Sequence, residues 1–320
     1  MSQNEKKLIF LFTALILLAS YNFKVLADEN EKLMQIKEKE KIMQNAYQKN
    51  FGSIELEAKS AYVFDLDDGR IIYKKNETEI MSLASITKIM TAIVAFESMS
   101  ENQVITIRKD DLDQEGDNDF FVNEKWDLLS IIKFMLFTSS NDAAQAIAYK
   151  GGEISDGNGT NNISIFVEKM NKKAQELNLK SLNFKNPSGL DIDSFNLGGI
   201  GGARDVGLLF AYAFKKYPEI FEPTSYSNFK FMSLSNKEHF VKNTNVFAEN
   251  FPQILASKTG FTRFAGGNLV VSFDIGIGHP VALVILGSSE NGRFQDALKL
   301  ATITIRYLQE VGNNKKYEGS

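Results

Sequence analysis

The chain has 320 residues, with 36 Lys and Arg, 40 Asp and Glu, two His and no Cys. The absence of cysteine excludes thiol nucleophiles, disulfides and thiolate metal sites. His239 and His279 are far apart and in no ligand spacing, which argues against a zinc site and against a Ser-His-Asp triad. The net charge of −4 gives no reason to expect nucleic acid as a partner. An enzyme of this composition therefore needs a base other than histidine.

The N-terminus resembles a targeting segment. Lys6 and Lys7 precede a continuous apolar run over residues 8–19, and Val25 and Ala27 offer small or apolar residues at a cleavage site. The apolar run is shorter than the roughly 20 residues of a membrane span. We predict a cleaved signal peptide over residues 1–27, with an uncleaved N-terminal anchor as the alternative. In both cases the protein is predicted to be exported to the periplasm or cell envelope, with membrane association only if the segment is retained.

The rest of the chain divides by composition. Residues 28–50 are rich in charge, with apolar residues near helical spacing, and are interpreted as a charged helical spacer. Residues 51–312 are predicted to form one domain, and residues 313–320 a polar tail. At 43% hydrophobic and 24% charged residues, the composition is that of an ordinary globular protein.

Periodicity in this domain predicts strands at both ends of a helical middle. The first two strands are joined by a turn at Asp67, Asp68 and Gly69. Because the last strands follow the helical region, we expect one sheet closed by the two halves of the chain, with an all-helical insertion beside it. The predicted strands are 60–66, 70–75, 268–274 and 281–286, and the predicted helices are 85–97, 128–137, 143–149, 165–177, 203–214 and 293–311.

Ser85 and Lys88 form an S-x-x-K motif, a pattern that also occurs at residues 130–133 and 227–230. The first copy differs from the others because it opens a strongly apolar predicted helix directly after a loop. Residues three apart share a helix face, so the Lys88 amine can reach the Ser85 hydroxyl. Backbone N–H groups at a helix start are also free to stabilise negative charge. Taken alone, the motif is better explained by a helix cap at Ser85 and a solvated lysine at position 88.

Two further motifs follow in the chain. Ser139 and Asn141 form S-x-N at a helix boundary, and Lys258, Thr259 and Gly260 form K-T-G before a predicted strand. The set S-x-x-K, S-x-N and K-T-G, in this order, is typical of penicillin-binding proteins and class A β-lactamases. Joint occurrence in order favours a catalytic interpretation that no single motif supports.

The sequence resembles the D-alanyl-D-alanine carboxypeptidase family of low-molecular-mass penicillin-binding proteins over about residues 58–311. The resemblance rests on AYVFDLDDGRIIY at 61–73, ASITKIMTA at 84–92, the SxNDAA run, the segment 166–190, the Ala203-Arg204-Asp205 helix start, and Gly292-Arg293. It implies an α+β fold of the β-lactamase and transpeptidase type, in which helices and an all-helical subdomain flank a central antiparallel sheet. It also implies that residues 51–312 are a D,D-peptidase catalytic domain.

The resemblance implies acyl transfer through a serine ester, without metal or cofactor. Ser85 would attack a peptidoglycan stem peptide at the penultimate D-Ala, and Lys88 would act as general base. Ser139 would pass a proton to the leaving amine, and Asn141 would orient Lys88 and the substrate. The remaining residues would bind the substrate. Lys258 would supply positive charge, and Thr259 and Arg293 would bind the terminal carboxylate. The N–H groups of Ser85 and Phe261, next to Gly260, would form the oxyanion hole. β-Lactams would be covalent inhibitors.

Several departures keep alternatives open. Ser188 stands where many family members carry His, and Thr244 lies near a position where some carboxypeptidases carry Arg. The chain stops soon after the last helix. This short form, together with Asn243-Thr244-Asn245 and KTGFT at 258–262, is also similar to the D,D-endopeptidase branch, which cuts cross-links. The carboxypeptidase is the main hypothesis and the endopeptidase the alternative, followed by a β-lactamase and an inactive wall-binding homologue.

Four other features are interpreted as structural or solvated. Glu176 lies in a segment similar to a β-lactamase signature, but Ala174 occupies the position of the base, so Glu176 is predicted to be a surface residue. The acidic run 111–119 starts like a Ca²⁺ loop but has Val122 at the twelfth position, which favours an exposed loop. The glycine-rich run 198–202 is predicted to be a flexible loop, and both histidines are predicted to be structural or solvated.

Overall fold

The computed structural model describes residues 2–116, 120–156, 162–193, 195–276 and 278–317. By internal contacts the chain divides into two compact units. The larger unit is residues 55–305, and the smaller unit combines residues 1–54 with residues 306–320. The larger unit contains all three motifs.

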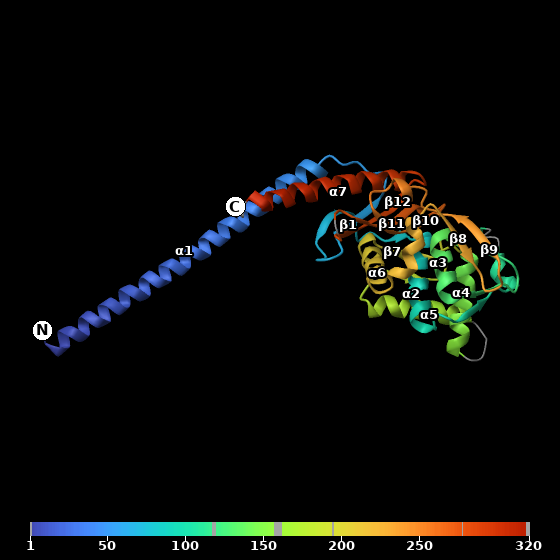
Figure 1. The fold of residues 1–320 in the computed structure, drawn as a ribbon, viewed down its shortest axis with the longest axis horizontal. Coiled ribbons are helices and arrows are strands. Elements are labelled where there is room, and N and C mark those ends of the chain that lie inside the picture. Colours follow the sequence, from blue (N-terminus) through green and yellow to red (C-terminus); the bar gives the residue numbers. More distant parts are fainter. Residues whose placement is uncertain (1, 117–119, 157–161, 194, 277, 318–320) are drawn as a thin grey trace. The chain divides into compact units, whose positions relative to one another are not determined.

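A five-stranded antiparallel sheet forms the centre of the larger unit (Figure 1), with the strand order β10-β11-β12-β1-β2. β1 and β2 come from the start of the domain and the other strands from its end, so the two halves of the chain close one sheet, as predicted. β12 and β1 bury nearly every side chain, as expected for strands covered on both faces. The strands are β1 (Ser60–Asp65), β2 (Ile71–Lys75), β10 (Ile254–Thr262), β11 (Gly266–Asp274) and β12 (Pro280–Ser288).

Helices pack below this sheet in the view of Figure 1, and the first part of α7 lies above it. The first eight residues of the central helix α2 are buried, and the helix contacts α3, α4, α5 and α6. Its apolar sequence thus becomes the core of the helical region. The helices are α2 (Lys88–Ser98), α3 (Leu128–Thr138), α4 (Asn141–Asp156), α5 (Asn162–Glu176), α6 (Ala203–Lys216) and α7 (Gly292–Tyr317), with 3₁₀ segments at Ala84–Thr87, Lys109–Asp113, Pro218–Ser225 and Ala248–Asn250.

The prediction of a flexible loop at residues 198–202 is wrong. Gly199–Gly201 is strand β7, which pairs with β3 (Met81–Ser82) on one side and β6 (Asn183–Phe184) on the other. A Cβ on Gly199 would lie 2.3 Å from the Thr87 hydroxyl oxygen, so glycine here permits close packing beneath the S-x-x-K turn. Glycine at these positions therefore allows β7 to pack closely against the turn that contains Ser85.

Eight strands of the described residues were not predicted from periodicity. Besides the short strands β3, β6 and β7, they are β10 itself and two hairpin-like pairs, β4 (Val104–Thr106) with β5 (Lys125–Asp127), and β8 (Asn228–Met232) with β9 (Glu238–Lys242). β10 contains the K-T-G motif, whose polar and glycine residues interrupt the apolar pattern that strand prediction depends on. The third motif thus lies on the edge strand of the main sheet.

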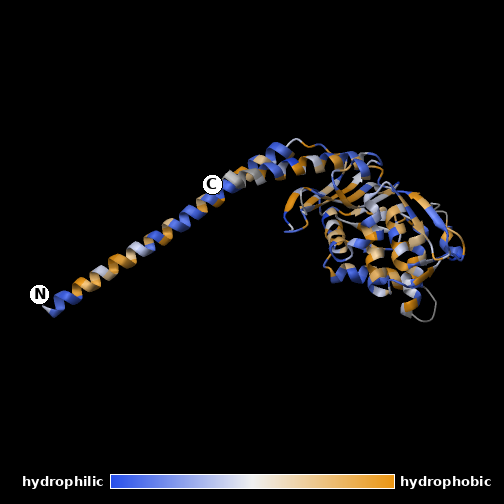
Figure 2. Cartoon of the chain, viewed as in Figure 1, coloured by the Kyte–Doolittle hydropathy of each residue, from blue (hydrophilic) through white to orange (hydrophobic). Residues whose placement is uncertain are grey.

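The smaller unit is built from α1 (Gln3–Phe51) and the end of α7. Phe51 and Tyr47 contact Tyr307 through their rings, and the Lys49 amine lies 2.8 Å from a Glu310 carboxylate oxygen. α7 continues to Tyr317, beyond the helix end predicted at residue 311. In the described residues α1 contains the one window that is apolar and long enough to cross a membrane, a property it shares with secretory signals. Figure 2 shows this apolar character in the N-terminal part of α1.

Candidate active site

Ser85 lies in a tight turn that leads into α2. The 3₁₀ segment Ala84–Thr87 precedes the helix, and Ala84 has a left-handed backbone with φ of 47°. Such a conformation is unfavourable for a residue with a Cβ and is found mostly where function or close packing requires it. Ser85 remains half-buried, whereas its neighbours on both sides are buried. The turn therefore presents the Ser85 hydroxyl from an otherwise closed segment.

Lys88 is fully buried and its amine lies at the centre of three acceptors. Nζ is 2.9 Å from Ser85 Oγ, 2.6 Å from Asn141 Oδ1 and 2.9 Å from the Ser188 carbonyl oxygen. Burial lowers the pKa of Lys88 from 10.5 to about 7. At neutral pH a large fraction of the amine is therefore unprotonated. In that form two N–H groups can bind Asn141 and Ser188, and the lone pair faces the Ser85 hydroxyl.

Asn141 is the first residue of α4, and its amide is bound at both ends. Its Nδ2 donates to the Glu115 carbonyl oxygen at 2.6 Å, which leaves Oδ1 to accept from Lys88. This second bond fixes the orientation of the amide, because a flipped amide would place two donors against each other. The backbone at Glu115 thus helps to hold the lysine in place.

Ser139 and Lys258 form a second pair. Ser139 ends α3 in a left-handed conformation with φ of 64°, and Lys258 Nζ donates to its Oγ at 2.8 Å. Lys258 is buried and also donates to the carbonyl of Thr259. Burial, together with the nearby charges of Lys88 and Arg293, lowers the pKa of Lys258 well below 10.5. The hydroxyl group of Ser139 is thereby left free to donate its own proton.

The remainder of K-T-G packs directly against the Ser85 turn. A Cβ on Gly260 would lie 2.8 Å from the Leu83 carbonyl oxygen and 3.2 Å from the Ser85 nitrogen, so only glycine allows β10 this close. The following residue, Phe261, is 46% exposed. The edge of β10 and the amide of Ser85 are therefore neighbours, as an oxyanion hole formed by the two segments requires.

Arg293, at the start of α7, is buried behind the same strand. Its NH1 donates to the Gly260 carbonyl oxygen at 2.7 Å, and its guanidinium carbon lies 4.7 Å from the ring centre of Phe294. Burial lowers its pKa from the ordinary value of 12.5, although a guanidinium remains charged. Arg293 thus places positive charge on the far side of β10, where it touches the strand backbone.

The structure brings all nine predicted site residues to one place, in two linked groups around Ser85 and β10. Sequence reasoning missed the contributions of backbone atoms, namely the carbonyls of Ser188 and Glu115, since residue type gives no signal for them. It also left Thr244 without a role. The hydroxyl of Thr244 lies 2.6 Å from that of Thr259, so the two side chains form a hydrogen-bonded pair beside the edge strand β10.

The secondary predictions have mixed outcomes. Glu176 is exposed and pairs with Lys173 at 2.7 Å, which confirms a surface role. The acidic run is not uniformly exposed: Asp111 is fully buried and pairs with Arg108, because the 3₁₀ segment Lys109–Asp113 turns its carboxylate inward. Residues 117–119 of this run lie outside the described part of the chain.

Both histidines have carboxylate partners. His239 is buried on β9 with Nε2 2.7 Å from Glu124, and His279 is half-buried with Nε2 2.5 Å from Asp65. The structural interpretation of the two residues is thus confirmed. Ligand atoms of His279, Asp65 and Asp67 all lie within 4.8 Å of one another. The Arg70 guanidinium, 3.5 Å from Asp65 Oδ2, already supplies a cation to this group.

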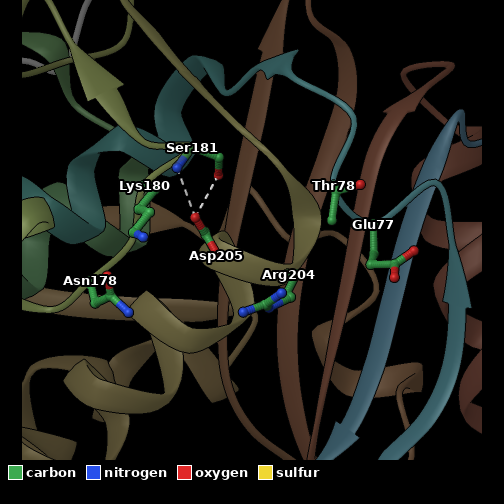
Figure 3. A pocket seen from close by; sticks show the side chains of 7 residues that line it. All are labelled: Glu77, Thr78, Asn178, Lys180, Ser181, Arg204 and Asp205. Carbon is green, nitrogen blue, oxygen red and sulfur yellow. Dashed lines mark hydrogen bonds between the residues drawn. The ribbon is translucent and has the colours of Figure 1, made fainter.

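A pocket of about 250 Å³ at the start of α6 explains the Ala203-Arg204-Asp205 motif (Figure 3). Asp205 accepts hydrogen bonds from the backbone nitrogen and hydroxyl of Ser181, at 2.9 and 2.8 Å. The Ser181 hydroxyl in turn accepts from the Gly202 nitrogen at 3.0 Å. Figure 3 shows Asp205 turned toward Ser181, with Arg204 and Lys180 at the same opening. This network joins α6 to the preceding loop and contains no member of the Ser85 group.

Comparison with known proteins identifies relatives over the same region. A family model described as D-alanyl-D-alanine carboxypeptidase matches residues 43–290. The D-alanyl-D-alanine carboxypeptidase DacF of Bacillus subtilis is 30% identical over 76% of this chain and 61% of its own length. A D-alanyl-D-alanine endopeptidase of Escherichia coli is 29% identical over 78% of this chain and 77% of its own. The chain therefore spans less than two thirds of the first relative.

Solved structures agree on the architecture. A penicillin-binding protein from Listeria monocytogenes, in its cefotaxime-bound form, is 25% identical, with a TM-score of 0.65. The alignment covers 79% of this chain and 98% of that protein. The sheet order, the flanking helices and this likeness together confirm the α+β fold of the penicillin-binding protein type.

Proposed function

This chain belongs to the D-alanyl-D-alanine carboxypeptidase family, and from that premise we propose that it is a serine D,D-carboxypeptidase. It would remove the terminal D-Ala from peptidoglycan stem peptides through an acyl-enzyme. The observation that carries the proposal is the buried amine of Lys88, 2.9 Å from Ser85 Oγ, in a group that contains no carboxylate. A lysine with a pKa of about 7 can serve as a base at neutral pH, as the composition requires.

The acylation step follows from these contacts. Ser85 Oγ attacks the carbonyl carbon of the penultimate D-Ala, and its proton passes to the Lys88 lone pair. The oxyanion lies between the N–H groups of Ser85 and Phe261. Ser139 gives its proton to the departing amine of the terminal D-Ala, and the proton held by Lys88 then returns to the Ser139 oxygen, beside the amine of Lys258, so that both groups regain their starting states. In deacylation a water molecule attacks the ester carbon and gives a proton to Lys88, which passes it to Ser85 Oγ as the C–O bond to Ser85 breaks.

Recognition of the substrate carboxylate is assigned to the start of the K-T-G segment. Thr259 offers a hydroxyl and Lys258 a buried amine on the edge of β10. Arg293 binds the backbone of Gly260, so we propose that it strengthens the positive field behind the strand and also holds the strand in position. Arg293 is therefore proposed to position β10, and not to bind the substrate carboxylate itself.

The test combines labelling with product analysis. After incubation with a fluorescent penicillin, mass spectrometry is expected to find the label on Ser85, and Ser85→Ala is expected to stay unlabelled. Digestion of purified muropeptides by the wild type should release free D-Ala, which Ser85→Ala should not release. A folded wild-type protein that takes up no label would contradict the proposal.

A D,D-endopeptidase is the second candidate. The Escherichia coli endopeptidase aligns over 77% of its length, a larger share than the carboxypeptidase from Bacillus subtilis. In addition, the Thr259 hydroxyl is already bonded to Thr244, which has no charge to attract a free carboxylate. Loss of cross-linked dimers in the same digest, without release of D-Ala, would favour this function.

The same proposal defines location and domain roles. Activity on peptidoglycan places the catalytic domain, residues 51–312, outside the cytoplasm. Residues 1–27 would act as a signal peptide, or as an anchor if retained, followed by a spacer at 28–50 and a tail at 313–320. The cefotaxime complex of the Listeria monocytogenes protein supports β-lactams as covalent inhibitors of this chain. Sequencing the N-terminus of the exported protein decides between signal and anchor.

A further inference from the structure

Asn268 is a fully buried polar residue on β11, the strand next to β10, and takes no part in the chemistry described above. Its Nδ2 donates to the Ser82 carbonyl oxygen at 2.9 Å, and its Oδ1 accepts from the Gly287 nitrogen at 2.8 Å. The second bond fixes the orientation of the amide, because a flipped amide would turn its NH₂ group toward the Gly287 N–H. The side chain therefore links the sheet to the backbone of Ser82, shortly before Ser85 in the chain.

A β-bulge makes this arrangement possible. In the register of β11 and β12, Leu286 and Gly287 together stand opposite the single residue Asn268. Gly287 has φ of 68°, a left-handed conformation that glycine adopts without strain. Its N–H is bound by the Asn268 side chain, so the bulge leaves this donor satisfied. Bulges often redirect a side chain beside an active site, and here the redirected group is the Asn268 amide.

The carbonyl that accepts from Asn268 belongs to β3, the short strand that leads into the Ser85 turn. On its other side this segment is held by β7, because the Leu83 N–H donates to the Gly199 carbonyl oxygen at 2.9 Å. The next residue takes the left-handed conformation with φ of 47°, and the Ser85 amide follows directly. The position of that amide therefore depends on where the end of β3 is fixed.

Asn268 reaches the turn beside the K-T-G strand. It stands directly opposite Gly260 in the register of β10 and β11, and opposite residues of an antiparallel pair point to the same face of a sheet. On this face the Cβ position of Gly260 is 2.8 Å from the Leu83 carbonyl oxygen and 3.2 Å from the Ser85 nitrogen. Glycine thus permits the close approach of the turn to β10, and the Asn268 amide provides a hydrogen bond that maintains it.

We propose that Asn268 is a positioning residue for the nucleophile. Its bond to the Ser82 carbonyl holds the Ser85 turn against β10 and so sets the spacing of the two N–H groups of the oxyanion hole. The inference rests on the proposed D,D-peptidase function, in which the N–H groups of Ser85 and Phe261 bind the oxyanion. Such hydrogen bonds are strongest in the transition state, so a change of their spacing lowers the rate of reaction more than it weakens binding.

The test replaces this amide and follows acylation by penicillin in stopped-flow experiments. Asn268→Leu keeps most of the volume of the side chain and loses both hydrogen bonds, and Asn268→Ala loses them without the risk of a clash. In both variants the acylation rate constant is expected to fall about tenfold or more, while the dissociation constant of the noncovalent complex stays within about twofold. The apparent pKa of acylation should not change, because Lys88 keeps its three contacts.

An infrared measurement reports on the oxyanion hole itself. In the penicillin acyl-enzyme the ester carbonyl oxygen lies in the hole, where hydrogen bonds from the two N–H groups lower its stretching frequency. The ester band of the Asn268→Leu and Asn268→Ala acyl-enzymes is therefore expected at higher wavenumber than that of the wild type. A purely structural role of Asn268 would lower stability and leave this band in place.

Asn171 offers a matched control. It is half-buried, and its amide binds the N–H and the carbonyl oxygen of Phe184, both at 2.8 Å, which links α5 to β6. These bonds are of the same kind as those of Asn268, but they end on a strand that does not lead into the Ser85 turn. Asn171→Leu and Asn171→Ala are expected to lower the melting temperature, to keep the acylation rate constant within about twofold and to leave the ester band unmoved.

The outcomes separate the inference from the function on which it rests. Wild-type acylation rates in folded Asn268→Leu and Asn268→Ala would overturn the positioning role. Equal losses in the Asn268 and Asn171 variants, with the ester band unmoved, would overturn it as well, because they would show damage to the fold alone. If Asn268→Leu does not fold, Asn268→Ala decides by the same measurements. A folded wild type without label on Ser85 would instead overturn the proposed function itself.

Discussion

The two ends of α2 place lysine in opposite environments. At the first residue, Lys88 is fully buried next to Lys258, and within the described part of the chain no carboxylate forms an ion pair with either amine. At the last turn, Glu97 contacts the amines of Lys173 and Lys216 at 2.6 and 3.1 Å, on the surface. Lysine therefore has different roles in the two clusters. The buried lysines have no carboxylate partner among the described residues, whereas the surface lysines surround the carboxylate of Glu97.

The pKa values follow from this difference. Burial lowers the pKa of Lys88 to about 7, and the positive end of the α2 dipole acts in the same direction. Burial alone would raise the pKa of Glu97, but hydrogen bonds from Lys173, Tyr212, Lys216 and Tyr217 lower it to about 2. The surface cluster stabilises the charged form of Glu97, whereas the buried cluster favours the neutral form of Lys88. Reactive lysine therefore arises from the absence of a carboxylate within a buried site.

The largest expected effect comes from replacing one lysine in the cluster at each end of α2. Lys88→Met is expected to lower the rate of acylation by penicillin about 10³-fold, since the base is lost while the volume of the side chain is kept. Lys173→Met, the matched control in the surface cluster, is expected to leave this rate within about twofold. Stopped-flow measurement of acylation checks both. Equal losses in the two variants would show that the environments do not differ in function.

The same contrast predicts how stability depends on pH. The pKa of Lys88 is about 7 in the folded state and has its ordinary value of 10.5 in the unfolded chain, so between these pH values the unfolded state binds more protons than the folded state. Raising the pH from 7 to 9 should therefore stabilise the wild type relative to Lys88→Met by about 2 kcal/mol. Below pH 7 the full cost of the buried ammonium is present in the wild type. Urea unfolding of both proteins at three pH values measures the difference, and a constant difference would contradict it.

Activity should follow the protonation of Lys88 as well. The unprotonated amine is the reactive form, so the acylation rate is expected to rise with pH and level off above about 7. At pH 6 the rate should be roughly tenfold below the plateau, because about a tenth of the amine is unprotonated. Acylation rates between pH 5 and 9 give the apparent pKa. A rate that is flat through this range would remove Lys88 as the titrating base.

The three motifs and the closure of the sheet could be predicted because they depend on residue type and order. Ser85, Lys88 and Lys258 were found in this way. The K-T-G strand and β7 were missed because glycine marks close packing in both, and periodicity cannot distinguish packing from a loop. Asp111 was expected to be exposed, yet it is buried because Arg108 neutralises it, a pairing that appears only in three dimensions.

Backbone groups and long-range contacts were beyond sequence reasoning for a related reason. The Ser188 carbonyl binds Lys88 through the backbone, so the departure from the family residue at this position does not remove the contact. The Asn268 side chain binds the carbonyl of Ser82, which is 186 residues away in the chain. Motifs thus identify the reacting atoms, whereas the atoms that orient them depend on the folded path of the chain.

The smallest expected effect tests the surface cluster by itself. Glu97→Gln removes the charge that Lys173 and Lys216 share, and Tyr217 keeps at most a neutral acceptor. Because the cluster is partly solvated and Lys173 retains Glu176, the unfolding free energy should fall by only about 1 kcal/mol. The acylation rate and its apparent pKa should not change. A shift of the apparent pKa of acylation in Glu97→Gln would show that Glu97 and Lys88 interact electrostatically along α2. The two ends of the helix would then not be independent environments.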